Sequence, residues 1–150
     1  MKTIIIYGSK HHGNTEKLVR GIAKARDIVL VDAIKESIPD LQEYDCIGFA
    51  SGIAAGRCYK QVLEAAKQLP TGKKVFILYT AANQDEKYGS DVKAIAEQKN
   101  SVYLGTFGCK GYNTFGPLKL IGGMNKENPT PEEIKEAIAF YEEIFGGCNC

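Results

Sequence analysis

The stretch that decides the fold is Thr3-Ile4-Ile5-Ile6-Tyr7-Gly8-Ser9-Lys10-His11-His12-Gly13-Asn14-Thr15. It starts with an apolar run that is typical of a buried strand. The run breaks into a small polar loop, and an amphipathic helical pattern opens after the loop. A strand that feeds such a loop into a helix N-terminus makes an anion site, because unpaired backbone N–H groups and the positive helix end converge there. The stretch therefore predicts that a phosphorylated ligand binds at this loop.

Other phosphate-binding loops do not match these residues. The sequence after the first predicted strand contains no Gly-x4-Gly-Lys-Ser/Thr, no Gly-x-Gly-x-x-Gly and no cysteine that could act as a phosphatase nucleophile. The strand also lacks the acidic end that a receiver domain needs. One plainer alternative stays open, in which Gly, Ser, Asn and Thr serve only the turn and the helix cap.

Strand and helix patterns alternate along the rest of the chain. Short apolar runs with little period-two alternation predict five strands buried on both faces. These strands are Thr3–Tyr7, Ile28–Val31, Cys46–Ala50, Val75–Tyr79 and Val102–Phe107. Helical stripes of apolar residues separate them at 18–25, 59–69 and 92–96. Residues 32–44 predict only a short helix or an irregular crossover, because Pro39 limits helix length.

The final helix has the clearest boundaries. Its apolar residues from Ile134 to Phe145 fall on one face. Thr130 is in place to be the N-cap, Pro131 the first helical residue, and Glu133 the partner of a capping box. The pair Gly146-Gly147 is expected to end this helix.

Buried strands joined by helices predict a doubly wound, five-stranded parallel α/β sheet with right-handed crossovers and helices on both faces. The chain of 150 residues is expected to form one domain over 1–150, with 146–150 as a flexible Gly/Cys tail. In such sheets ligands bind at the carboxyl ends of the strands, where the strand order reverses. The loops at 51–57 and 80–85 are therefore expected beside the first loop.

The first loop resembles the phosphate loop of flavodoxins, in which a hydroxyl residue, a short spacer and Gly-Asn-Thr wrap the terminal phosphate of FMN. The matching residues are Ser9, Gly13, Asn14 and Thr15, with a spacer, Lys10-His11-His12, one residue longer than the commonest form. Flavodoxins are the standard example of ligand binding at a reversal of strand order; their order is 2-1-3-4-5, with FMN between strands 1 and 3. The resemblance implies that the hydroxyls, the Asn14 side chain and the loop amides hold the phosphate. The cationic spacer either adds charge to the site or stays solvated.

The second predicted loop resembles the flavodoxin pattern Ser-Gly-Ile-x-x-Gly, which borders the isoalloxazine ring. Its residues here are Ser51, Gly52, Ile53, Ala54, Ala55 and Gly56. Glycine lets the backbone approach a flat ring and turn a peptide group toward flavin N5. The resemblance implies this role for Gly52 or Gly56, and the alternative is that both glycines only permit a tight turn.

Two further segments extend the resemblance over nearly the whole chain. In the loop after the fourth predicted strand, Thr80, Ala81 and Ala82 would border the same site. The glycine-rich segment 105–111, followed by Phe115-Gly116-Pro117, is similar to segments of small single-domain flavodoxin-like proteins.

The aromatic residues depart from the family pattern. Flavodoxins commonly hold the isoalloxazine between a Trp and a Tyr, but this chain has no Trp, and the loop at 51–57 offers only aliphatic side chains. One face of the ring is therefore expected to be open or covered by aliphatic groups. Tyr88 could stack on the ring or serve as an ordinary aromatic at a helix start. Tyr59 is the other aromatic candidate for the ring, but its helical spacing predicts a core residue.

Charge and cysteine usage indicate the compartment. The formal net charge of +1 favours neither nucleic acid nor an anionic membrane, whereas flavodoxins are usually strongly acidic. No apolar run approaches the roughly 20 residues of a membrane span, and the N-terminus leads directly into a strand, so a cytoplasmic protein is expected. Five irregularly spaced cysteines predict reduced thiols. The tail residues Cys148 and Cys150 form either a soft-metal or redox pair or part of a mobile tail.

The resemblance implies an FMN-binding electron-transfer protein that exchanges electrons with a reductase and an acceptor protein. FMN would carry out the redox chemistry, so the sequence assigns no catalytic residue and no metal ligand. The near-neutral charge predicts a less negative second reduction potential than that of acidic flavodoxins. The alternatives are an FMN-dependent NAD(P)H:quinone-type reductase and a flavin-free interaction domain of the same fold.

Overall fold

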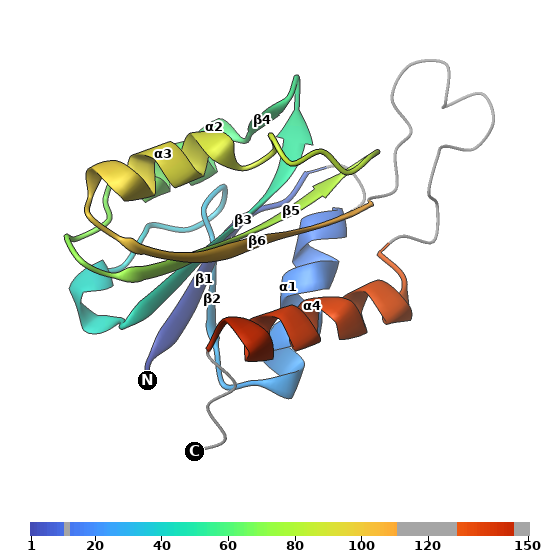
Figure 1. The fold of residues 1–150 in the computed structure, drawn as a ribbon, viewed down its shortest axis with the longest axis horizontal. Helices are drawn as coiled ribbons and strands as arrows, with labels where there is room; N and C mark the ends of the chain where they lie inside the picture. Colours follow the sequence, from blue (N-terminus) through green and yellow to red (C-terminus); the bar gives the residue numbers. More distant parts are fainter. Residues whose placement is uncertain (11–12, 111–128, 146–150) are drawn as a thin grey trace.

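A parallel sheet crosses the middle of the molecule, and helices cover both of its faces (Figure 1). The computed structural model describes residues 1–10, 13–110 and 129–145. The parallel strands are β1 (Thr3–Gly8), β2 (Val29–Asp32), β3 (Cys46–Ala54), β5 (Lys74–Ala81) and β6 (Val102–Lys110). Their order is β2-β1-β3-β5-β6. Apart from the short strand β4 (Arg57–Cys58), this is the predicted order 2-1-3-4-5, and the doubly wound α/β fold is confirmed.

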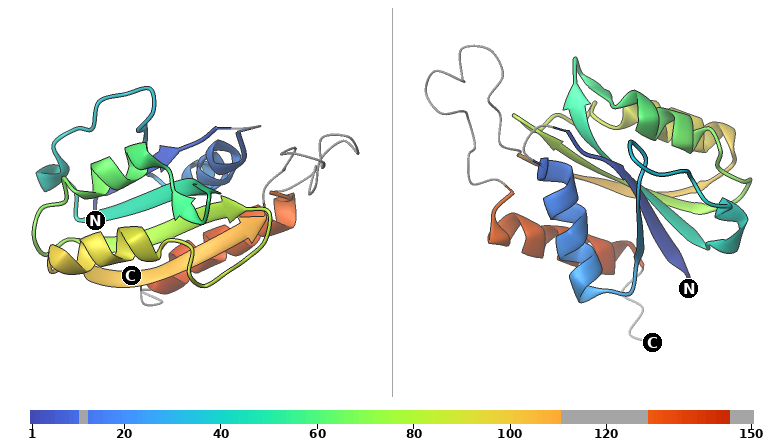
Figure 2. Two further views of the ribbon diagram at one scale, coloured as in Figure 1. Left: turned by 90° about the horizontal axis from the view of Figure 1, so that it is seen from above. Right: turned by 180° about the vertical axis from the view of Figure 1, so that it is seen from behind.

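Among the described residues, two helices lie on each face of the sheet. α2 (Lys60–Ala66) and α3 (Ser90–Gln98) share one face, while α1 (Asn14–Ala25) and α4 (Pro131–Ile144) share the other (Figure 2). The crossover from β2 to β3 is irregular, as predicted, and contains one 3-10 turn at Leu41–Glu43. α4 begins with the predicted capping box, in which the Thr130 and Glu133 side chains each accept the other residue's backbone N–H.

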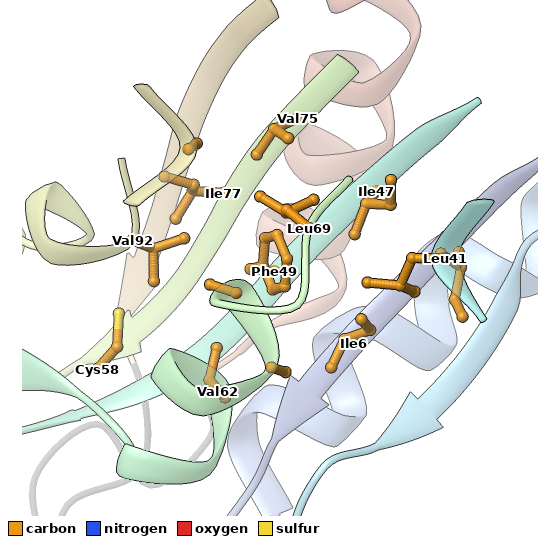
Figure 3. Packing of buried hydrophobic residues seen from close by; sticks show 14 of the residues in the cluster. Ile6, Leu41, Ile47, Phe49, Cys58, Val62, Leu69, Val75, Ile77 and Val92 are labelled. Carbon is orange, nitrogen blue, oxygen red and sulfur yellow. The ribbon is translucent and has the colours of Figure 1, made fainter. Parts of the chain in front are cut away.

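The core explains why the strand residues form continuous apolar runs. Ile4 and Ile6 of β1 pack toward α2, whereas Ile5 packs toward α1, and all three are fully buried. Figure 3 shows the α2 side, where Phe49 of β3 lies among aliphatic side chains from β1, β5 and α2. Burial of such a side chain stabilises the fold by about 1.5–3 kcal/mol. Because both faces of such a strand are buried in the core, its residues are apolar throughout and do not alternate with polar ones.

Several predicted strand bounds were wrong. β3 was predicted to end at Ala50 and to be followed by a loop at 51–57, but it continues to Ala54. The prediction of five strands missed β4, which pairs antiparallel with the end of β3 (Ile53↔Cys58 and Ala54↔Arg57). Ala55 (φ 51°) and Gly56 (φ 77°) form the two-residue turn between them. Positive φ at both central residues is the geometry of a type I′ hairpin. The sequence signal was weak because Ala does not favour this conformation.

The last strand was predicted to end at Phe107, but β6 extends to Lys110 and includes Gly108 and Cys109, where a glycine-rich loop was expected. It pairs in parallel with β5 after a bulge at Val75/Phe76. Gly108 is required there because a Cβ at this position would lie 1.9 Å from the Tyr79 ring. Glycine in this strand therefore makes room for a large neighbour, and Cys109 is buried beside it.

None of the described helices combines the length and the apolar character that crossing a lipid bilayer requires. The expectations for His11, His12, Phe115-Gly116-Pro117 and the tail 146–150 lie outside the described residues.

Candidate functional site

The strand order reverses between β1 and β3, and the carboxyl ends of β1, β3 and β5 are neighbours in the sheet. The strand register pairs Gly8 with Ser51 and Gly52 with Thr80. Three segments that are far apart in sequence therefore meet at one edge: the loop after β1, the end of β3, and the end of β5. This is the place where open α/β sheets bind ligands.

The loop after β1 delivers the N-terminus of α1 to this edge. Gly13 is the N-cap residue with φ 66° and contributes no side-chain cap. The Glu16 N–H instead donates to Ser9 Oγ at 3.1 Å. A Cβ at Gly13 would meet nothing within 4 Å, so the positive φ, and not crowding, is the reason for glycine. The loop therefore combines helix N–H groups, a hydroxyl and open space, which are the features of an anion site.

A buried hydroxyl pair connects the start of α1 to the end of β5. Thr15 Oγ1 and Thr80 Oγ1 lie 2.8 Å apart, and the two residues are only 2% and 4% exposed. One hydrogen bond leaves each hydroxyl with further hydrogen-bonding capacity. The pair fixes the helix start over the sheet edge and brings together Thr15 and Thr80, two of the predicted site residues.

Tyr59 forms the wall between the ends of β1 and β3. It is buried in the core, as its helical spacing predicted. A Cβ at Gly52 would lie 2.5 Å from Tyr59 Oη, so the ring occupies the space that Gly52 leaves. Lys10 Nζ lies 4.7 Å from the centre of the same ring. Tyr59, one of the two aromatic candidates from the sequence, therefore borders the candidate site as well as the core.

The Ser51 side chain bonds to backbone groups at the base of the hairpin formed by β3 and β4. Its hydroxyl donates to the Gly52 carbonyl at 2.6 Å and accepts the Tyr59 N–H at 2.8 Å. Of the two glycines considered for a peptide that turns toward a ring, Gly56 has positive φ, with open space around it, and Gly52 does not. The geometry therefore favours Gly56 for that role, and Gly52 serves the packing of Tyr59.

The remaining residues at the hairpin end are aliphatic. Ile53 is half-buried, while Ala54 and Ala55 are exposed. No aromatic side chain belongs to the hairpin turn. A flat ligand beside it would be covered there by aliphatic groups or by solvent.

The loop after β5 is folded around Tyr79. Tyr79 Oη donates to the Asp85 carbonyl at 3.2 Å and accepts the Asp85 N–H at 3.1 Å. Tyr88 packs edge-on against Tyr79 with 5.3 Å between ring centres, and its hydroxyl donates to Asn83 Oδ1. Tyr88 precedes α3, whose N-cap is Gly89. A contact of Tyr88, Ala81 or Ala82 with a cofactor stays a prediction.

A separate cavity of about 300 Å³ lies between α3 and β6 and is lined by residues that include Tyr79, Tyr88, Lys93 and Tyr103. Its tyrosine hydroxyls bond within the protein, and Lys93 Nζ lies 4.6 Å from the centre of the Tyr103 ring. Among the described residues of the predicted phosphate loop none lines it, whereas the predicted site residue Tyr88 does. The cavity is therefore separate from the described part of the phosphate loop.

The described cysteines are buried free thiols, in agreement with the expected reduced state. Burial raises the pKa of Cys46 and of Cys109 from 9.0 to about 12. Burial, followed by the nearby Asp91 charge, also raises the pKa of Cys58. All three thiols stay protonated at neutral pH and are poor nucleophiles.

One residue of this region had no sequence signal at all. Asp91, at the start of α3, accepts the Cys58 N–H through Oδ2 at 3.0 Å. The two residues are 33 positions apart, so only the folded chain reveals the contact.

Comparison with known proteins finds relatives over nearly the whole chain. A family model described as a flavodoxin domain matches residues 4–143. An uncharacterized protein of Methanocaldococcus jannaschii, MJ0298, is 38% identical over 150 residues, with 97% of this chain and 99% of that protein covered.

Solved structures agree on the fold. The two-electron reduced flavodoxin of Megasphaera elsdenii has a TM-score of 0.60 at 20% identity and covers 91% of this chain and 98% of its own. A flavoprotein of Lactobacillus acidophilus in complex with FMN has a TM-score of 0.55 at 21% identity and covers 71% of this chain and 92% of its own.

Proposed function

The chain belongs to the flavodoxin family, and from that premise we propose that it binds FMN and carries electrons between redox partner proteins. The observation that supports the proposal is the geometry at the start of α1, which suits an anion. The Gly13 turn lies there together with Ser9, which accepts the Glu16 N–H, and the buried pair Thr15–Thr80 connects this helix start to β5. The FMN in the Lactobacillus acidophilus structure supports the choice of cofactor.

The residues present fit FMN in two places. The terminal phosphate would be held by the α1 N–H groups, Ser9, Asn14 and Thr15, with Lys10 adding positive charge. The ring would lie toward the hairpin turn, where a side chain at Gly56 would fill open space. When bound, FMN supplies one- and two-electron redox chemistry. The protein's part is to bind the cofactor, to limit solvent access and to direct peptide groups toward the ring.

One observation favours a second candidate function, an FMN-dependent reductase that takes hydride from NAD(P)H. Ala54 at the end of β3 and Ala55 in the turn are exposed and carry no aromatic cover, so one ring face would be accessible to a hydride donor. Anaerobic mixing of the FMN-loaded protein with NADPH distinguishes the two functions. An electron carrier is expected to keep its flavin colour until a separate reductase is added, whereas the enzyme would bleach at once.

The proposed function is tested by titrating flavin-free protein with FMN and with riboflavin, which lacks the phosphate. We expect FMN to bind at least tenfold more tightly, a difference of about 1.4 kcal/mol, with quenching of flavin fluorescence. Ser9→Ala is expected to weaken FMN binding and to leave riboflavin binding unchanged. Ser37→Ala, at an exposed serine, is the matched control. Equal affinity for both flavins contradicts the phosphate site, and no binding of either supports a flavin-free domain.

A further inference from the structure

The hairpin formed by β3 and β4, residues 53–58, is held from outside. Its turn residues, Ala55 and Gly56, are exposed and both have positive φ. β4 pairs with β3 through only two residue pairs. Because so short a hairpin is only marginally stable by itself, its position depends on the contacts that hold β4.

Asp91 provides one of these contacts. Its Oδ2 accepts the Cys58 N–H at 3.0 Å, and its Oδ1 accepts the Val92 N–H at 2.8 Å at the start of α3. The Asp91 side chain is 17% exposed, and Arg57 Nε lies 4.0 Å from Oδ2. A hydrogen bond from an N–H to a carboxylate is about twice as strong as a neutral one. The negative charge is also favourable at the start of a helix.

The neighbouring residue is held in the same way. The Tyr59 N–H, next along the chain from that of Cys58, donates to the buried Ser51 hydroxyl. Two consecutive backbone N–H groups are therefore bound by side chains, one on α3 and one on β3. Cys58 between them is only 5% exposed. The exposed turn is therefore followed directly by residues whose backbone is fixed by these two hydrogen bonds.

We propose that Asp91 is a positioning residue of the flavin site, which acts through the Cys58 N–H to fix the peptide group at Gly56 relative to the ring and so sets the flavin reduction potentials. The inference rests on the proposed function. A peptide that changes its hydrogen bond with the redox state of the ring shifts the potentials only if the hairpin holds it in place. Loss of the Asp91 contact would let the hairpin move, while the phosphate loop would keep its own contact, in which Ser9 accepts the Glu16 N–H.

The test compares the two midpoint potentials of the FMN-loaded wild type, Asp91→Ala, Asp91→Asn and the control Glu97→Gln, which removes one exposed charge from the same helix. Asp91→Ala is expected to shift the equilibrium between one- and two-electron-reduced flavin about tenfold, which is about 59 mV for a one-electron couple. Asp91→Asn, whose amide oxygen can still accept the Cys58 N–H, is expected to stay within about twofold of the wild type. Glu97→Gln should leave the potentials unchanged.

Two results would overturn the inference: Asp91→Ala behaving like Glu97→Gln, or Asp91→Asn shifting as far as Asp91→Ala. The second result would mean that charge acts and not the hydrogen bond. Should Asp91→Ala not fold, Asp91→Ser, too short to reach Cys58, takes its place. Wild type that binds no FMN defeats the proposed function and the inference together, whereas FMN binding with unshifted Asp91→Ala potentials defeats the inference alone.

Discussion

The loop after β1 and the hairpin formed by β3 and β4 border the same sheet edge but are built differently. The first loop is fixed by its own helix and by the buried pair Thr15–Thr80. The hairpin has an exposed turn and is fixed by Asp91 and Ser51, which lie outside it. Under the proposed function the two regions would have different roles: the first would provide affinity for a phosphate, and the second would adjust the chemistry of the ring.

Alkaline pH is expected to have the largest effect, because it lowers the free energy of unfolding of the whole fold and so disrupts both regions together. Burial raises the pKa of Cys46 and Cys109 to about 12, so the protonated thiols stabilise the fold below the ordinary value of 9.0. That stability is lost as the pH rises from about 9 toward 12, by about 1.4 kcal/mol per pH unit and thiol. Urea unfolding at pH 8, 9 and 10 measures it. The loss should be smaller in Cys46→Ala/Cys109→Ala; an equal loss in that variant contradicts the assignment.

Gly52→Val is expected to damage the wall that both regions share. A Cβ at Gly52 would lie 2.5 Å from Tyr59 Oη, so the ring must move. Overpacking of this kind costs about 1–3 kcal/mol in the free energy of unfolding. Urea denaturation followed by circular dichroism measures the loss. A loss well below about 1 kcal/mol would show that crowding at Gly52 is unimportant.

Thr15→Val separates affinity from stability at the first region. It leaves the buried Thr80 hydroxyl without its partner and is expected to cost about 1–3 kcal/mol of stability, together with FMN affinity. Adding Thr80→Val should recover stability, because replacing both partners by apolar groups is nearly neutral. Affinity for FMN, measured by fluorescence quenching, should not recover. Recovery of both would mean that Thr15 has no contact with the phosphate.

Gly56→Ala is expected to have the smallest effect on stability and to act on the second region alone. Its φ of 77° strains any other residue by about 1–2 kcal/mol, and the open space around it adds no clash. FMN affinity should change less than in Thr15→Val, while the reduction potentials move. A variant with unchanged potentials and weakened FMN binding would reverse the roles given to the two regions.

Local signals explain which features the sequence could predict. The apolar run 3–7, the loop with Gly13, and the capping box of Thr130 and Glu133 each depend on neighbouring residues, and the structure has them where they were expected. The strand order followed from the number of buried strands and the resemblance. The core position of Tyr59 followed from helical spacing.

Long-range contacts explain what the sequence could not predict. The partner of Asp91 is 33 residues away, and that of Thr15 is 65 residues away. β4 was missed because the positive φ at Ala55 depends on the hairpin as a whole. The length of β6 was underestimated because the need for glycine at 108 arises only from its contact with the Tyr79 ring. In each case the role of the residue depends on a neighbour in the folded structure, and a single sequence does not identify that neighbour.

The most direct test of the central claim is a map of backbone amide chemical-shift changes when FMN is added to the isotope-labelled protein. The account predicts the largest changes at two places, the start of α1 with Ser9 and Gly13 and the turn at Ala55 and Gly56. Riboflavin should reproduce only the second set. Changes confined to the cavity near Lys93 and Tyr103, or no change at all, would contradict it.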